Sequence, residues 1–111
     1  PQYSSSKAAV INLTQALARE FAPSGVTVNA VCPGLIWSAM WEKLAVLVAE
    51  ENPRLAGRSP REVFDDAVRQ TPLGLAQSPE DVGRAVAFLA SEDARTITGQ
   101  AISVDSGSVM H

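Results

Sequence analysis

The sequence contains very little cysteine and histidine, and it has no long uninterrupted hydrophobic run. One cysteine among 111 residues excludes a disulfide framework within the chain. Charged residues interrupt the apolar stretches well before the roughly 20 residues that a membrane-spanning helix needs. Nine Lys and Arg against twelve Asp and Glu leave no dense basic patch of the kind that nucleic-acid binding requires. With 46% hydrophobic residues, we expect one soluble, cytoplasmic domain with a modest core.

Three residues that could carry chemistry have simpler interpretations. Cys32 ends an apolar run, where a small buried thiol is favoured over a nucleophile. Asp105 follows a predicted strand, where an aspartate more often forms a turn than acts as an acid. His111 is the last residue, and a solvated terminus is favoured over metal ligation. We therefore predict no metal site.

The first part of the chain predicts a helix followed by a strand. Residues 4–22 carry apolar side chains at helical spacing, which predicts a helix with a buried stripe that a Pro-Ser-Gly sequence stops. The stripe consists of Val10, Leu13, Leu17 and Phe21. Residues 26–32 are apolar and rich in β-branched side chains, which favours a buried parallel strand that the following Pro-Gly pair ends.

The rest of the chain predicts a helical insertion, a further helix and a last strand. Within residues 38–70, two weaker helical patterns cover 39–51 and 60–69. Helical spacing returns after Pro79, and residues 101–104 predict a short strand.

Two of these helix starts share one local mechanism. Ser59 and Ser78 each precede a proline, which places a hydroxyl acceptor at the N-cap and proline at the first helical position. Acidic residues follow in the first turn, where the helix dipole favours negative charge.

The order of helix, strand, helical insertion, helix and strand predicts an α/β fold. Two apolar strands joined through a helix describe a right-handed parallel crossover. We expect one partial domain over residues 1–111, with 38–70 as its insertion. Because the sequence enters a helix almost at once, we also expect it to be part of a longer chain.

Tyr3 and Lys7 form the strongest candidate pair for chemistry. They lie four residues apart at a predicted helix start, so both side chains project from one face. A free phenol has a pKa of about 10, and a neighbouring ammonium favours its ionised form. Such a tyrosine can exchange a proton with an alcohol or carbonyl oxygen. An accidental pairing on a surface helix is the alternative, and the surrounding motifs decide between the two.

Five segments, taken in order, resemble landmarks of the short-chain dehydrogenase/reductase family. Residues 3–7 (YSSSK) match its Tyr-x-x-x-Lys segment, and residues 28–34 (VNAVCPG) resemble its strand and Pro-Gly turn. Residues 79–82 (PEDV), 88–91 (FLAS) and 98–100 (TGQ) resemble its later landmarks. The resemblance implies the C-terminal part of a doubly wound, Rossmann-type parallel sheet. It also implies an oxidoreductase that transfers hydride between NAD or NADP and a carbonyl or secondary alcohol.

The resemblance implies roles for particular residues. Tyr3 would be the general acid and base, and Lys7 would lower the pKa of Tyr3 and hold the nicotinamide ribose hydroxyls. Pro33 and Gly34 would border the nicotinamide, although a simple strand-ending turn is their alternative interpretation. The following residues Ile36 and Ser38 would meet the cofactor through a backbone group and a hydroxyl.

The insertion 38–70 corresponds by resemblance to a mobile lid over the substrate. Trp37, Met40 and Trp41 stand at its start, and pocket lining and core packing are both open for them. The Met-Trp pair before a long insertion is similar to the branch of polyol, acetoin and butanediol dehydrogenases. A small hydroxylated substrate is therefore favoured, and a 3-oxoacyl-carrier reductase is the alternative within enzymes.

Some family features have no counterpart in this sequence. The Gly-rich phosphate loop, the residue that selects NAD or NADP and the active-site serine are absent, so cofactor binding by this chain alone is expected to be very weak. Leu75 stands where the family commonly has arginine, and Ser106 replaces a glycine. If position 106 needs a positive φ, a serine there is strained.

The expected partners are the nicotinamide cofactor and a small-molecule substrate. Two strands alone make a marginal sheet with an apolar edge, so we expect a homo-oligomer or association with a missing N-terminal part. The rival hypothesis, from a different functional class, is an inactive remnant or assembly module that keeps the oligomerising helices without binding cofactor.

Overall fold

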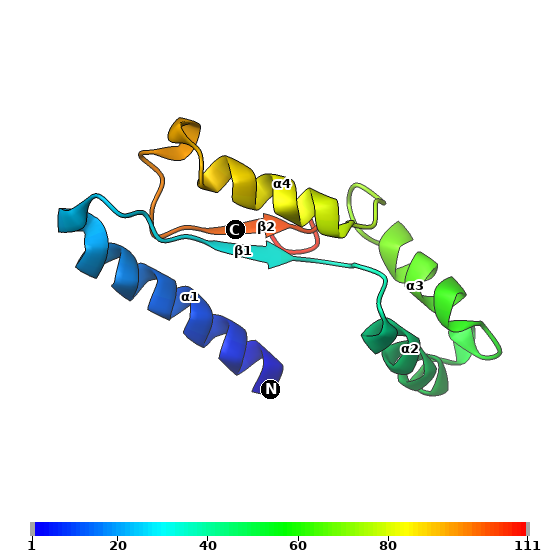
Figure 1. Ribbon diagram of the computed structural model, residues 1–111. Helices are drawn as coiled ribbons and strands as arrows, with labels where there is room; N and C mark the ends of the chain where they lie inside the picture. The colour runs from blue at the N-terminus through cyan, green and yellow to red at the C-terminus, as the bar shows by residue number, and fades with distance from the viewer. Residues whose placement is uncertain (1, 111) are drawn as a thin grey trace. The chain divides into compact units, whose positions relative to one another are not determined.

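A computed structural model describes the backbone of residues 2–110 and the side chains of residues 5–110. Its α-helices are α1 (Gln2–Phe21), α2 (Ala39–Glu51), α3 (Pro60–Arg69) and α4 (Pro79–Leu89) (Figure 1). The two strands are β1 (Ala30–Pro33) and β2 (Ala101–Val104). Short 3-10 turns follow three of the helices: η1 (Ala22–Ser24), η2 (Pro53–Leu55) and η3 (Glu92–Ala94). The predicted α/β order and the positions of the helices are confirmed.

The chain divides into two compact units. One unit combines Pro1–Cys32 with Glu80–Val104, and the other combines Pro33–Pro79 with Asp105–His111. Among residues 2–110, none of the helices has both the length and the hydrophobicity to cross a bilayer.

The first unit contains the two-stranded parallel sheet (Figure 1). Its pairing begins before the strands themselves, where the Gly99 amide donates to the Val28 carbonyl at 2.7 Å. The Ala30 amide then donates to the Gln100 carbonyl at 2.8 Å. Because α4 lies between β1 and β2 in sequence, the predicted parallel crossover is confirmed.

The strand begins later than the predicted range 26–32, because side chains replace the regular backbone ladder there. The Thr98 hydroxyl accepts from the Val28 amide at 3.0 Å. Asn29 donates from its amide nitrogen to the Ile97 carbonyl and accepts from the Gln100 amide, at 3.0 and 3.1 Å. β1 therefore covers only Ala30–Pro33.

Helices α1 and α4 pack against opposite faces of this sheet (Figure 1). Alternate residues of the β1 segment, beginning at Thr27, line a groove of about 480 Å³ with one side of α4. Helix α1 instead approaches the segment that leads into β2, where a Cβ built on Gly99 would lie 3.5 Å from the Cβ of Ala18. Helices on both faces are the arrangement of a doubly wound sheet.

The predicted buried stripe of α1 is wrong for three of its four residues, and the fourth, Leu17, is half-buried. Val10, Leu13 and Phe21 are 54%, 56% and 43% exposed, whereas the buried residues of the described helix are Thr14 and Ala18. The helix packs through these smaller residues, which lie to one side of the stripe and allow close approach to the sheet. The side chains of Val10, Leu13 and Phe21 stay exposed because no described element covers them.

The second unit is built around the hairpin of α2, η2 and α3. Its core consists of Ala45, Leu55 and Val63, with Trp41 packed against it. The start of α3 has the predicted N-cap, since the Ser59 hydroxyl accepts from the Glu62 amide at 3.2 Å. Glu62 returns the contact by accepting from the Ser59 amide at 3.1 Å, which completes a capping box. This hydrogen bond from the Ser59 backbone is the main reason that the pKa of Glu62 is lowered.

Candidate active site

The predicted proton-transfer pair lies at the start of α1, in the first unit. The backbone of Tyr3 belongs to the first turn of the helix, and its side chain lies outside the described residues. Lys7 follows four residues later on the same continuous helix, and its side chain is exposed. The helical backbone therefore directs both positions toward one face.

The predicted cofactor-facing segment, residues 33–38, lies at the end of β1 and opens the second unit. Pro33 and Gly34 are exposed, and Ile36 is half-buried. Ser38 has extended backbone and is the N-cap of α2, with its carbonyl accepting from the Trp41 amide at 3.0 Å. Its hydroxyl makes no capping hydrogen bond, so the helix start does not use this group.

A buried glutamine that sequence reasoning missed holds this segment. Gln77 is 7% exposed, and its side-chain oxygen accepts from the Leu35 amide at 2.7 Å. The backbone N–H of Gln77 donates to the Leu35 carbonyl at 2.9 Å. Both polar backbone groups of Leu35 therefore bond to one residue 42 positions away. No local pattern marks Gln77, because its partners Leu35 and Ser106 are distant in the sequence.

The segment after β2 meets the same glutamine. Gln77 donates from its side-chain nitrogen to the Ser106 hydroxyl at 2.7 Å and to the Leu75 carbonyl at 2.8 Å. Ser106 in turn donates from its hydroxyl to that carbonyl at 2.6 Å, and its own carbonyl accepts from the Leu73 amide at 3.0 Å. These hydrogen bonds join three stretches of the second unit: Leu35, residues 73–77 and Ser106.

Ser106 and Asp105 behave as the sequence predicted. Ser106 has φ of 57°, so a side chain occupies a conformation that favours glycine. Asp105 forms the turn, with its two carboxylate oxygens accepting from the Gly107 and Val109 amides at 3.0 and 3.1 Å. Asp105 is buried and its carboxylate is engaged by these amides.

The three residues at the start of the insertion have different environments. The Trp37 and Trp41 rings both pack edge-on against Phe64, at centroid distances of 5.3 and 5.1 Å. The Arg61 guanidinium lies 5.0 Å from the Trp37 ring centroid. Met40 is 67% exposed. The structure thus brings the two tryptophans together at a fully buried phenylalanine and leaves Met40 apart from them.

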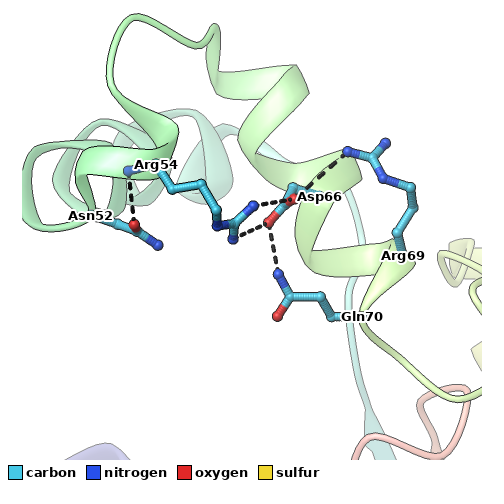
Figure 2. Close-up of polar contacts among 5 residues, drawn as sticks. All are labelled: Asn52, Arg54, Asp66, Arg69 and Gln70. Carbon is cyan, nitrogen blue, oxygen red and sulfur yellow. Dashed lines mark hydrogen bonds and ion pairs between the residues drawn. The ribbon is translucent and has the colours of Figure 1, made fainter.

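A polar network joins η2 to the C-terminal half of α3 (Figure 2). Arg54 donates through both terminal nitrogens to the two Asp66 oxygens, at 2.9 and 3.0 Å. Gln70 adds a hydrogen bond to Asp66 at 2.8 Å, and Arg69 lies 3.7 Å away. The Asn52 side chain accepts from the Arg54 amide at 3.1 Å. The hydrogen bond from Arg54 is the main reason that the pKa of Asp66 is lowered and that of Arg54 is raised.

Metal ligation has no candidate in the part of the chain that the structure describes. No group of three or more His, Cys, Asp or Glu side chains within residues 5–110 is placed to hold an ion. Cys32 is a half-buried free thiol, and His111 lies outside the described residues.

Comparison with known proteins gives consistent matches along the chain. A family model described as enoyl-(acyl carrier protein) reductase matches residues 1–109. An (S)-acetoin-forming diacetyl reductase of Staphylococcus aureus is 44% identical over 105 residues, or 95% of this chain and 39% of the relative. A 3-oxoacyl-[acyl-carrier-protein] reductase of Rickettsia felis is 45% identical over 108 residues, or 97% of this chain and 39% of the relative.

Solved structures agree with the sequence matches. A short-chain dehydrogenase family protein from Francisella tularensis superposes with a TM-score of 0.80 at 30% identity. The match covers 95% of this chain and 42% of that protein. The chain thus spans about two fifths of the length of the proteins it matches. It belongs to the short-chain dehydrogenase/reductase family.

Proposed function

We propose that the protein is an NAD- or NADP-dependent oxidoreductase that interconverts a carbonyl compound and a secondary alcohol. One observation carries the proposal: 95% of the chain aligns at 44% identity with a diacetyl reductase. The Tyr-x-x-x-Lys segment of this sequence lies at the start of α1. The activity needs both members of that segment, Tyr3 and Lys7.

Tyr3 and Lys7 would handle the proton of the reaction. A nicotinamide cofactor, when bound, would supply the hydride that reduces the carbonyl carbon. The Tyr3 hydroxyl would give its proton to the carbonyl oxygen and become a phenolate. In the reverse reaction the Tyr3 phenolate would take the hydroxyl proton of the alcohol. A cation at Lys7 stabilises the phenolate that remains, because an ammonium nearby lowers the pKa of a phenol. The same ammonium would hold the ribose hydroxyls of the cofactor.

The turn after β1 is the proposed contact for the nicotinamide ring and its carboxamide. Gly34 exposes backbone without a side chain, and the Ser38 hydroxyl is not taken by the helix that it caps. In the proposal Pro33 and Gly34 border the nicotinamide, the Ile36 backbone meets its carboxamide, and Ser38 adds a polar contact. The sequence does not separate NAD from NADP, because the residue that selects between them has no counterpart in this chain.

A small diol or hydroxyketone is the proposed substrate, with residues 38–70 as the lid. The diacetyl reductase match supports this class, and the exposed side chain of Met40 is suited to contact a ligand. Trp37 and Trp41, which pack on Phe64, would form the wall of the substrate pocket behind Met40. The match to a 3-oxoacyl reductase favours a second candidate, an acyl thioester.

The proposal also includes association of this chain with another polypeptide segment. Val10, Leu13 and Phe21 leave an apolar face on α1, and the groove beside α4 is lined by Val82 and Val86 among others. Surfaces of this kind favour association, either with a second copy or with the remaining part of a longer chain. A free thiol at Cys32 suits the cytoplasm.

Turnover by the complete protein tests the proposed activity. Oxidation of NADH and NADPH is followed with diacetyl, acetoin and an acyl thioester as alternative substrates. Tyr3→Phe and Lys7→Met are expected to lower kcat by about 10²–10⁴-fold, whereas the matched control Ser5→Ala on the same helix leaves kcat unchanged. Activity on the thioester alone would favour the second candidate.

The rival assembly module predicts a different result. It predicts no turnover and no effect of millimolar NADH or NADPH on the melting temperature or on Trp37 and Trp41 fluorescence. Either cofactor effect in the wild-type protein rules the module out, and the absence of both together with no turnover rules out the enzyme.

A further inference from the structure

Gln77 has every side-chain polar group engaged, and all of its partners lie in the second unit. Its oxygen accepts from the Leu35 amide, and its nitrogen donates to the Leu75 carbonyl and the Ser106 hydroxyl. A buried amide with this many directed contacts has one orientation, because any rotation would leave a donor or an acceptor unpaired.

The contacts with Leu35 fix two successive peptide planes. The Leu35 amide belongs to the plane that it shares with the Gly34 carbonyl, and the Gln77 side chain holds it. The Leu35 carbonyl belongs to the plane that it shares with the Ile36 amide, and the Gln77 backbone holds it at 2.9 Å. The peptide bond between Leu35 and Ile36 is trans, so the Ile36 N–H points opposite to the Leu35 carbonyl.

Gly34, in the turn after β1, lies directly against the Gln77 side chain. A Cβ built on Gly34 would come within 2.6 Å of the side-chain oxygen of Gln77 and of the Cβ of Asp105. The backbone at residue 34 therefore lies directly against the amide that holds Leu35. A side chain at residue 34 would push Gln77 out of its position.

Backbone strain at Ser106 supports a role beyond simple packing. Its φ of 57° is unfavourable for a side chain, and strain of this kind persists only where the surroundings hold it. Here the hydroxyl accepts from Gln77 and donates to the Leu75 carbonyl. The strained residue thus keeps the Gln77 amide in place.

We propose that Gln77, held by Ser106, is a positioning residue that orients the Leu35–Ile36 backbone toward the carboxamide of the nicotinamide cofactor. This inference rests on the proposed function, because that function places the cofactor at Ile36. Gln77 itself does not touch the reacting atoms. It acts through the two peptide planes of Leu35.

The experiment compares three variants of the complete protein. Gln77→Leu removes all three side-chain hydrogen bonds of the glutamine and replaces it with a residue of similar size. Ser106→Gly removes the hydroxyl that holds Gln77 but relieves the strain at positive φ, so it keeps the protein folded. Gln70→Leu is the matched control, since it removes an exposed glutamine of the same unit that contacts Asp66.

Two measurements are made, hydrogen exchange at the Leu35 amide and steady-state kinetics with the cofactor varied. Gln77→Leu is expected to speed Leu35 exchange by about tenfold and to raise KM for the cofactor by about tenfold. Ser106→Gly is expected to speed Leu35 exchange by about threefold and to raise KM for the cofactor by about threefold. In both variants KM for the carbonyl substrate should change less than KM for the cofactor. Gln70→Leu should change neither value.

Two different failures can be distinguished. If Gln77→Leu lowers the melting temperature but leaves Leu35 exchange or the cofactor KM as in the wild type, the positioning role is overturned and the proposed function stands. If the wild-type protein neither binds nor uses NADH or NADPH, the proposed function fails and the positioning role fails with it.

Discussion

Gly34 lies so close to Asp105 that there is no room between them for a methyl group. A Cβ added at residue 34 would stand 2.6 Å from the Cβ of Asp105 and 2.8 Å from its Cα. The second of these atoms is backbone, so it cannot move aside as the end of a long side chain can. Gly34→Ala is therefore expected to cost about 1–3 kcal/mol in the free energy of unfolding, because the turn after β1 must separate from the segment after β2. Urea unfolding measures this.

Gly83 offers a matched control for that substitution. It lies inside α4, and a Cβ built there meets no atom within 4 Å. Gly83→Ala is expected to stabilise the protein by about 0.5–1 kcal/mol, since alanine is the better helix former. Equal losses of stability from both substitutions would contradict the steric explanation for Gly34.

The two serine N-caps of the second unit should differ in their contribution to stability. The Ser59 hydroxyl accepts from the Glu62 amide, whereas the Ser38 hydroxyl makes no such contact at the start of α2. Ser59→Ala is expected to cost about 1 kcal/mol, because it leaves a helix amide without its partner. Ser38→Ala should cost clearly less in thermal unfolding. If Ser38 contacts the cofactor as proposed, the same variant should raise KM for NADH or NADPH.

Acid should weaken the hairpin through Asp66. Its pKa is lowered in the fold, first by the hydrogen bonds from Arg54, whereas in the unfolded chain it returns to about 3.9. The folded state therefore stays ionised at a pH where the unfolded chain binds a proton. The stabilisation is fully present above the unfolded pKa and is lost as pH falls through the lower folded value.

Thermal unfolding at a series of pH values tests this contribution. Asp66→Asn is expected to lower the melting temperature at pH 7 and to flatten its fall between pH 5 and pH 3. Asp65→Asn is the control, because Asp65 pairs with Arg61 at 3.3 Å where both side chains are about half exposed. A steep acid dependence that survives in Asp66→Asn would assign the effect to another carboxylate.

Local sequence signals predict the helical hairpin. The role of Gln77 depends on long-range contacts, which local signals do not predict. Ser59 and Pro60 marked the start of α3 because capping is settled within one turn. The spacing of Tyr3 and Lys7 is equally local. Gln77 carries no such mark, since its role arises only when Leu35 and Ser106 meet it across 42 and 29 positions.

Burial was harder to predict than periodicity. The spacing of Leu13 and its neighbours correctly indicated a helix, but it did not say which residues face the sheet. In the structure the buried Ala18 lies on the side of α1 that faces Gly99. The strand boundary shifted for a related reason, since Asn29 and Thr98 replaced ladder hydrogen bonds with side-chain ones.

Phe64 is expected to hold Trp37 and Trp41 in place in the proposed lid. Its side chain is fully buried, and both tryptophans of the chain pack edge-on against its ring. Phe64→Ala is expected to cost about 3–5 kcal/mol, because it removes a large buried ring and leaves a cavity. Phe64→Leu should cost less, since most of the volume is kept.

Tryptophan fluorescence separates this local effect from global instability. Trp37 and Trp41 are the only tryptophans, so the emission of this chain reports directly on the rings that contact Phe64. In folded Phe64→Leu the emission should shift to longer wavelength, because the looser packing lets water reach the indoles. Leu47→Ala is the control in the same unit: its side chain is 57% exposed on α2, and it should change stability by no more than about 0.5 kcal/mol and leave the emission unchanged. An unshifted spectrum in Phe64→Leu would show that the two tryptophans are held by contacts other than the phenylalanine ring.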